Sequence, residues 1–209
     1  MAYLILSRHG TSEWNKLGKW TGLTDVDLAP EGVDEARRAG EAIKGLEIHK
    51  VFTSALKRAH QTFEQIKKAA GQEHLVGNKH PALNERDYGQ FTGKNKWQVK
   101  EEVGELEFQN IRRGWDAVVL GGENLKDVHA RVVPYYEEHI RPHLLEGQNV
   151  LVVAHGNSLR ALVKHLENIS DKRIADLEIG FAEVYCYEID KEGKILGKEI
   201  RHTNVYKGI

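Results

Sequence analysis

The sequence predicts a single α/β domain in which a doubly wound, mainly parallel sheet is flanked by helices. Three observations favour this fold: short apolar runs typical of strands, apolar residues at helical spacing between them, and no Pro-rich or Ser-rich linker in 209 residues. Strands that alternate with helices indicate a parallel sheet, because each helix returns the chain to the edge where the next strand begins. We expect residues 1–209 to fold as one domain.

Five segments are expected to form strands, because they are apolar throughout or alternate between apolar and polar residues. A histidine that glycine follows comes shortly after the first of these segments, at His9, and directly after the third, at His155. The five lie at residues 3–6, 50–53, 150–154, 183–190 and, after a turn at 191–194, in a last extended segment that ends near residue 202.

Two helices are expected before residue 78, each with apolar residues every three or four positions. The first begins at Pro30, because the missing N–H of proline costs no hydrogen bond in the first turn of a helix. The second begins near Ser54, has Arg58 in its first turn and ends at Gly71. The inward positions of the first helix are Val33, Ala36, Gly40 and Ile43.

The second half of the chain begins with an irregular region. Residues 78–120 lack a clear period and mix glycines, charges and aromatics, which predicts an excursion above the sheet with short helices at most. Long loops of this kind are often functional. Asn124 and Asp127 have the spacing of a helix cap and predict a long helix over 125–144. Another helix is expected directly after His155.

Charge and hydropathy exclude several classes of function. Thirty Lys and Arg residues against 31 Asp and Glu residues give a formal net charge of −1, which provides no general attraction for nucleic acid or an anionic membrane. No apolar run approaches the roughly 20 residues that a membrane span needs. The first residues are too short and wrongly flanked for a signal peptide, so a cytosolic protein is expected.

The chain carries one cysteine, Cys186, which excludes an internal disulfide and a thiolate metal cluster. We expect it to be a packed strand residue. No His-Glu-x-x-His spacing or comparable ligand set occurs, so a zinc hydrolase is disfavoured and no metal is expected.

Of the eleven histidines, His9 and His155 differ from the rest because each ends an expected buried strand. In a parallel sheet both would lie at the carboxyl edge, where ligands bind. A neutral imidazole is a competent nucleophile near pH 7, and a phosphoryl group on it needs donors for its oxygens. Arg8, Arg58 and His155 are candidates for these donors, and peptide N–H groups at the helix starts are others.

The order of the motifs resembles the histidine phosphatase superfamily and, within it, the cofactor-dependent phosphoglycerate mutases. The resemblance covers nearly the whole chain. It rests on RHGTSEWN, TGLTDVDL, SALKRAHQT, LNERDYG, a downstream NK, a paired RR before an aromatic and Asp, and VVAHGNSLRAL.

The resemblance implies roles for individual residues. His9 is expected to accept the phosphoryl group and Glu85 to donate and accept the proton, as a transfer to or from a hydroxyl requires. The implied phosphate pocket contains Arg8, Asn15, Arg58 and His155, with contacts from Gly156 and Asn157. The implied contacts to the rest of the substrate come from Thr21, Gly22, Arg86, Tyr88, Lys96, Arg112 and Arg113.

The family implies interconversion of 3-phosphoglycerate and 2-phosphoglycerate, with 2,3-bisphosphoglycerate as primer, no metal, and small phosphoglycerates as the only partners. A broad phosphatase of the same superfamily is the alternative, and a nucleotide or metabolite binding module is a second. Lys96, Arg112 and Arg113 favour the mutase, because they supply charge beyond what one phosphate needs. The short path at 116–121 and the short chain after residue 202 leave closure of the site and oligomeric state open.

Overall fold

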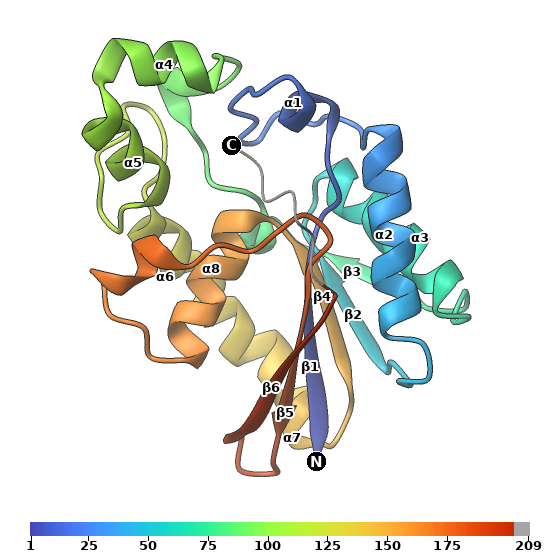
Figure 1. Ribbon diagram of the computed structural model, residues 1–209. Coiled ribbons are helices and arrows are strands. Elements are labelled where there is room, and N and C mark those ends of the chain that lie inside the picture. The colour runs from blue at the N-terminus through green and yellow to red at the C-terminus, as the bar shows by residue number, and fades with distance from the viewer. Residues whose placement is uncertain (203–209) are drawn as a thin grey trace.

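The computed structural model of the protein describes residues 1–202, and its six-stranded sheet lies between two layers of helices (Figure 1). The strand order is β3-β2-β4-β1-β5-β6, in which β1 to β4 are parallel and β5 and β6 are antiparallel to their neighbours. The mainly parallel α/β sheet is therefore confirmed. The strands are β1 Ala2–Arg8, β2 Lys50–Thr53, β3 Gly77–Lys79, β4 Val150–Ala154, β5 Val184–Ile189 and β6 Ile195–His202.

Helices follow β1, β2 and β4, as the sequence predicts, and two short helices occupy the irregular region. Short 3₁₀ turns lie at 81–83, 89–91 and 173–176, and a π-helical turn lies at 136–140. The α-helices are α1 Glu13–Lys16, α2 Pro30–Ala42, α3 Lys57–Ala69, α4 Lys96–Val103, α5 Glu105–Arg113, α6 Leu125–Tyr135, α7 Arg141–Leu145 and α8 Gly156–Leu166.

The two faces of the sheet bury separate hydrophobic clusters, because successive strand residues point to opposite sides. Leu4 and Val152 pack in the cluster that contains the apolar faces of α6, α7 and α8. Ile5 and Val153 pack in the cluster on the other side, under α2 and α3. Both faces are covered, which explains why β4 and the first five residues of β1 are apolar rather than alternating.

The pairing of β1 with β4 brings the two strand-end histidines together. These strands are parallel neighbours with Arg8 opposite Ala154, and His9 N donates to Ala154 O over 2.9 Å. After β1 the chain reaches α2 on one face of the sheet, whereas after β4 it enters α8 on the other. Adjacent parallel strands whose connections diverge in this way leave a crevice at their carboxyl ends.

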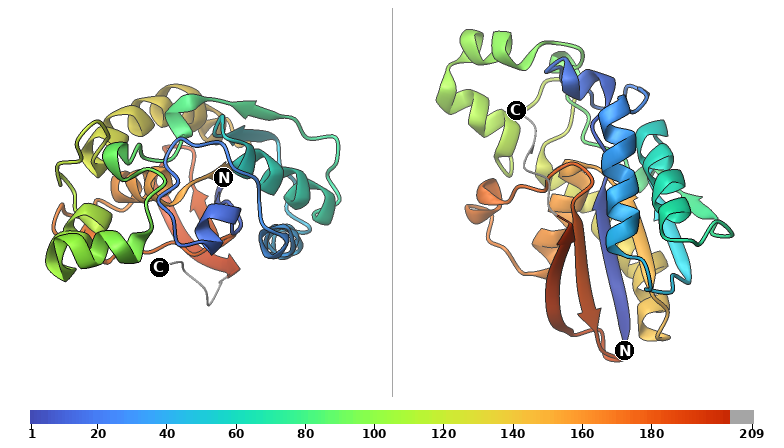
Figure 2. Two further views of the ribbon diagram at one scale, coloured as in Figure 1. Left: turned by 90° about the horizontal axis from the view of Figure 1, so that it is seen from above. Right: turned by 45° about the vertical axis from the view of Figure 1, so that its right-hand side comes forward.

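The excursion above the sheet has a hydrophobic cluster of its own. Figure 1 and the right-hand view of Figure 2 show α1, α4 and α5 at the end of the sheet where β1 and β4 finish. This position places the excursion over the crevice. Its cluster contains Trp20, Phe91, Val99, Phe108, Ile111 and Val119.

Several elements differ from the expectations. Val33 is exposed rather than inward, because the first turn of α2 packs through Gly32 on the loop after His9 and not on the sheet. The helix expected over 125–144 is interrupted by the π-helical turn after Tyr135, next to Pro134, which lacks the N–H that a regular helix needs. Strand β3 was not predicted, because Gly-Asn-Lys has low strand propensity.

Other expectations hold where the chain is described. Asn124 and Asp127 form a capping box at the start of α6, and Arg58 lies in the first turn of α3. Cys186 is a buried, free strand residue. Within residues 1–202 no helix is long and apolar enough to cross a membrane. The chain after residue 202, which bears on closure of the site, lies outside the described residues.

The loop that carries His9 is held against the first turn of α2. Glu35 accepts hydrogen bonds from Thr11 N over 2.7 Å and from Thr11 Oγ1 over 3.1 Å. Gly10 and Gly32 permit this approach, since a Cβ on Gly32 would overlap the carbonyl oxygen of Thr11. The position of the loop that carries His9 therefore depends on the absence of a side chain at these two glycines.

We expect Gly32→Ala to lower the free energy of unfolding by about 1–3 kcal/mol, because the added methyl group forces the two backbones apart. Gly197→Ala is the control, since a Cβ there meets only Glu188 Oε2 at 4.0 Å. Its effect should stay within about 0.5 kcal/mol. Urea unfolding of both variants measures the difference between their free energies of unfolding. Equal values would show that the backbones at Gly32 and Thr11 are not in tight contact.

Candidate active site

His9 lies at the end of β1 with its ring orientation set by its own loop. Its Nδ1 is 2.6 Å from Gly10 O, and because a carbonyl oxygen only accepts, Nδ1 carries the proton. The Nε2 lone pair is then available for attack on an electrophile. Burial and the cations of Arg58 and Arg8 hold the pKa of His9 well below its usual value, which keeps the imidazole neutral.

His155, at the N-terminus of α8, lies beside His9 with 4.9 Å between the ring centroids. Its side chain is fully buried, and its Nε2 is 2.7 Å from Ser54 Oγ. Ser54 was expected to begin α3, but it precedes that helix and holds His155 instead. Burial and the Arg58 cation lower the pKa of His155 as well, so the pair of imidazoles is neutral.

Two arginines beside the histidines are anchored by backbone carbonyls. Arg58 donates through Nη1 to Thr24 O over 2.9 Å and through Nη2 to Gly22 O over 2.8 Å. Arg8 donates to Ile179 O over 2.7 Å, and its guanidinium lies 3.8 Å from the centroid of the Phe181 ring. Carbonyls fix these side chains without cancelling their charge. Burial lowers the pKa of Arg58 to about 10, so that it stays protonated at neutral pH.

Glu85 is buried and held at one oxygen. Its Oε1 accepts from Arg86 N over 2.8 Å and from Asn157 N over 3.2 Å. Arg131 fixes the backbone here, because its guanidinium donates to Glu85 O over 3.0 Å. Within residues 1–202 the second carboxylate oxygen, Oε2, has no hydrogen-bond partner. Glu85 thus presents one free oxygen next to the crevice.

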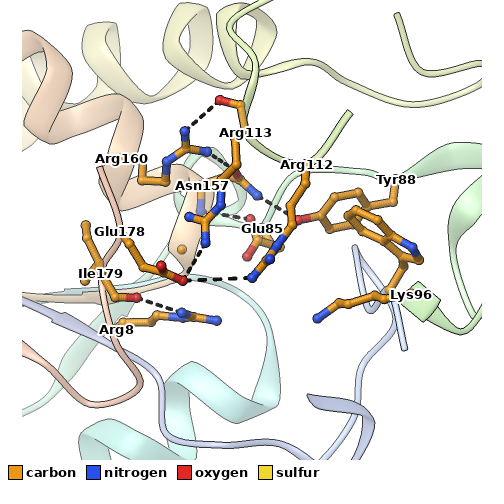
Figure 3. A pocket seen from close by; sticks show the side chains of 12 residues that line it. Arg8, Glu85, Tyr88, Lys96, Arg112, Arg113, Asn157, Arg160, Glu178 and Ile179 are labelled. Carbon is orange, nitrogen blue, oxygen red and sulfur yellow. Dashed lines mark hydrogen bonds and ion pairs between the residues drawn. The ribbon is translucent and has the colours of Figure 1, made fainter. Parts of the chain in front are cut away.

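The crevice has two adjoining compartments, whose common wall consists of Arg8, Trp20, Glu85, Tyr88 and Lys96. The inner compartment adds His9, Asn15, Lys19, Thr21 and Arg58. The outer compartment, drawn in Figure 3, adds chiefly Arg112, Arg113, Gly156, Asn157, Arg160 and Glu178.

These walls are strongly cationic. Seven of the lining side chains are Lys or Arg, whereas two, Glu85 and Glu178, are carboxylates. With both histidines neutral, the crevice carries an excess of positive charge that the nearly neutral chain as a whole does not show. Such a site favours small ligands with several negative charges.

The outer compartment is organised by Arg160 of α8. Arg160 Nη1 donates to Asn157 Oδ1 over 2.9 Å, and Asn157 Nδ2 donates to Tyr88 Oη over 2.8 Å. Arg160 Nη2 also donates to Arg113 O over 2.8 Å, which ties the end of α5 to α8. Figure 3 shows this chain of contacts along one wall of the compartment.

Among the described residues, buried donors of the inner compartment that have no hydrogen-bond partner include Trp20 Nε1, Thr21 Oγ1 and Arg58 Nε. Buried donors of this kind cost free energy unless something accepts from them. An anionic ligand with oxygen acceptors would satisfy them.

The structure brings most of the predicted site residues to the crevice. Arg86, Gly22 and His155 do not line it. Arg86 is fully buried, donates to Ile111 O over 2.7 Å and lies 4.5 Å from the Tyr88 ring, so that it supports Tyr88 from behind. Gly22 provides a carbonyl to Arg58, and His155 supports His9.

Sequence reasoning missed several lining residues: Lys19, Trp20, Arg160, Glu178 and Ile179. Arg160 could have been found, because it lies one helical turn after Gly156 and Asn157 in the same motif. Trp20 and Lys19 directly precede the Thr21-Gly22 pair. No signal marks Glu178, which lies in an irregular stretch before β5.

Within residues 1–202 no group of three or more His, Cys, Asp or Glu side chains could hold a metal ion, and metal independence stays a prediction.

A model of the histidine phosphatase superfamily (branch 1) matches residues 4–199. The chain belongs to the histidine phosphatase superfamily. Among its relatives in this superfamily, the 2,3-bisphosphoglycerate-dependent phosphoglycerate mutase of Mesorhizobium japonicum is 45% identical over 94% of this chain and 97% of that protein. The phosphoglycerate mutase of Schizosaccharomyces pombe is 43% identical over 94% of each chain.

Solved structures of other superfamily members share the fold. A phosphoglycerate mutase from Bacillus anthracis superposes with a TM-score of 0.77 at 22% identity and covers 96% of this chain and 92% of that one. A mycobacterial glucosyl-3-phosphoglycerate phosphatase superposes with a TM-score of 0.82 at 22% identity, over 98% and 99% of the two chains. At these identities the likeness establishes the fold alone.

Because of Lys96, the affinity of the crevice for anions is expected to depend on pH. Burial and the cations of Arg112 and Arg8 lower the pKa of Lys96 to about 7. The group is charged below that pH and neutral above it, so anion affinity should fall as the pH rises. We expect sulfate, which stays a dianion throughout, to bind about tenfold more weakly at pH 8.5 than at pH 6 by calorimetry. In Lys96→Arg the affinity should change little, and an equal fall in both proteins would rule out Lys96 as the cause.

Proposed function

We propose that the chain interconverts 3-phosphoglycerate and 2-phosphoglycerate, with 2,3-bisphosphoglycerate as the phosphoryl donor that primes it. The observation that carries the proposal is the pair of adjoining cationic compartments that share Glu85, of which one contains His9. Relatives 43–45% identical over nearly the whole chain are phosphoglycerate mutases, which supports it.

The two compartments suit a ligand with two separate anionic ends. A phosphoglycerate has a phosphate and a carboxylate, and the bisphosphate has a second phosphate. The inner cations Arg8 and Arg58 would neutralise the phosphate to be transferred. The outer cations Arg112, Arg113 and Lys96 would bind the remaining anionic groups. A phosphatase for simple monoesters needs only the first set.

The proposed nucleophile is His9 Nε2. It forms a bond to phosphorus while the bond from phosphorus to the substrate oxygen breaks, and Gly10 O keeps the Nδ1 proton in place throughout. The orphaned donors of Arg58, Trp20 and Thr21 are available for the phosphoryl oxygens. Neutral His9 and fixed cations require little rearrangement as charge moves, which lowers the barrier.

Glu85 is the proposed acid and base. Its Oε1 is already bonded to two backbone N–H groups, so Oε2 is the oxygen left to exchange a proton with the substrate. Glu85 protonates the oxygen that leaves phosphorus, and its carboxylate takes a proton from the hydroxyl that attacks phosphohistidine in the reverse step. Because Glu85 lies in the wall that the two compartments share, it can exchange a proton with either hydroxyl oxygen of the glycerate.

Isomerisation requires the bisphosphate intermediate to reorient without leaving. Arg8 and Lys96 line both compartments, and they would stay near one anionic group as the ligand turns. The phosphoryl group on His9 first goes to the free hydroxyl of 3-phosphoglycerate, which gives the bisphosphate. After the bisphosphate has turned, His9 takes the phosphoryl group from the other position, which releases 2-phosphoglycerate and restores the phosphohistidine. We place this reaction in the cytosol, in keeping with the substrates of the proposal and the absence of a spanning helix in residues 1–202.

Brief incubation with 2,3-bisphosphoglycerate should leave phosphate on His9 that is labile in acid and stable in alkali, as a phosphoramidate is. His9→Ala should lose the label and at least about a thousandfold in isomerase activity, since it removes the nucleophile. A coupled assay with and without added bisphosphate, repeated in EDTA, tests primer dependence and metal independence together. Full activity in His9→Ala would exclude the covalent route.

Arg113→Ala should raise the ratio of free phosphate to isomerised product by about tenfold or more, since one charge-assisted contact that retains the intermediate is lost. Arg37→Ala is the control, because Arg37 lies exposed on α2 and pairs with Glu41. The label on His9 should persist in both variants. If the unaltered protein hydrolyses simple phosphomonoesters faster than it isomerises phosphoglycerates, the phosphatase alternative replaces the mutase.

A further inference from the structure

One carboxylate in the cationic crevice has no place in the proposed chemistry. Glu85 is assigned to proton transfer, but Glu178 lines the outer compartment at some distance in sequence from every motif. It belongs to the segment 177–183, between the 3₁₀ turn that ends at Asp176 and strand β5. A negative side chain there reduces the positive charge that an anionic ligand needs.

The backbone around Glu178 is fixed by arginines of the site. Arg160 Nε donates to Leu177 O over 3.1 Å, and Arg8 Nη1 donates to Ile179 O over 2.7 Å. Tyr185 Oη adds a contact to Glu178 O at 3.4 Å. These bonds hold Leu177 and Ile179, the residues on either side of Glu178. The arginines of the site therefore fix the backbone position of Glu178. Only its side chain is left to rotate.

The side chain of Glu178 binds the cations proposed for the substrate. Its Oε1 lies 2.5 Å from Arg113 Nη2 and 3.9 Å from Arg112 Nη2. Figure 3 shows the carboxylate between these two guanidinium groups. The Glu178 side chain is 34% exposed, whereas those of Arg113 and Arg112 are 16% and 18% exposed. Of the three groups, the carboxylate has the easiest path to solvent.

We propose that Glu178 is a specificity-determining residue, which occupies the position of the ligand's carboxylate on Arg112 and Arg113 until the ligand displaces it. This inference rests on the proposed function, because it assigns the outer cations to the glycerate carboxylate. Binding then exchanges one carboxylate for another. The displaced Glu178 turns toward solvent while the backbone bonds to Arg160 and Arg8 remain.

The exchange has consequences for affinity. A protein whose binding-competent form is only partly populated shows an apparent affinity reduced by that fraction. Glu178 therefore weakens the binding of ligands that need Arg113, which are phosphoglycerates and the bisphosphate. Ligands that use only the inner compartment are hardly affected. Weaker retention also lets the product leave the outer compartment after transfer.

The test compares two ligands that differ in one group. 3-Phosphoglycerate has a carboxylate where glycerol 3-phosphate has a hydroxymethyl group, and both have one phosphate for the inner compartment. Dissociation constants are measured by calorimetry for the unaltered protein and for Glu178→Gln, which keeps the shape of the side chain and removes its charge. One charge-assisted contact changes a dissociation constant by about tenfold, and the partial exposure of Glu178 reduces this effect.

We expect Glu178→Gln to bind 3-phosphoglycerate about five- to tenfold more tightly, with a fall in KM of similar size, and to bind glycerol 3-phosphate less than about twofold more tightly. Glu178→Ala should act in the same direction. Asp176→Asn is the matched control, because Asp176 is an exposed carboxylate close by in sequence that does not line the compartment. It should leave both constants unchanged.

Two outcomes overturn the inference. An equal gain for both ligands would mean that Glu178 acts only through the general charge of the crevice. Unchanged or weaker binding of 3-phosphoglycerate in both Glu178 variants would mean that the side chain does not compete with the ligand. Failure of the proposed function is distinguishable, because it would show as the absence of isomerase activity and of phosphoglycerate binding in the unaltered protein.

Discussion

The parallel pairing of β1 with β4 is the constraint on which the site depends. The hydrogen bond from His9 N to Ala154 O extends this ladder by one residue beyond the strands. It therefore places the two imidazoles side by side through the backbone alone. Apolar residues on both faces of the two strands are buried, so a shift of either strand would expose part of both cores. The geometry of the proposed nucleophile is thus secured by the most buried part of the fold.

Neutral hydrogen-bond acceptors stabilise the arginine side chains that concentrate positive charge in the crevice. Arg8, Arg58, Arg86 and Arg160 each donate to backbone carbonyls, which anchor the guanidinium groups without cancelling their charge. Fixed in this way, the cations need not be reoriented when an anionic ligand arrives. Glu178 differs from these partners because it is charged and its side chain is free to rotate. That difference is why one contact in the crevice is exchangeable and the others are structural.

The excursion of residues 78–120 joins the two halves of the site. Arg131 of α6 holds the backbone of Glu85, and Arg160 of α8 holds the end of α5 through Arg113 O. The proposed proton-transfer group and the outer cations are therefore positioned by helices that pack on the sheet. Residues of the excursion can thus contribute to the site although the excursion itself lies outside the sheet.

Much of the fold and of the chemistry could be read from local patterns. The apolar runs before His9 and His155 predicted two buried strands and the edge where a ligand binds, since burial on both faces demands such runs. Pro30, Arg58 and the Asn124 cap lie where local geometry places them. The break after Tyr135 was missed, because propensity along one helix does not show how its partners pack.

The sequence by itself determined the family and pointed to the proposed nucleophile, the first arginines and the proposed proton-transfer carboxylate, because these belong to short motifs whose residues act close to one another in the chain. Only the tertiary structure decided that Arg86 supports Tyr88 from behind, that Trp20 and Arg160 line the crevice, and that Glu178 lies on Arg113. The last contact joins residues 65 positions apart. Such a contact depends on how the excursion and the segment before β5 fold over the sheet, and no local spacing encodes that arrangement.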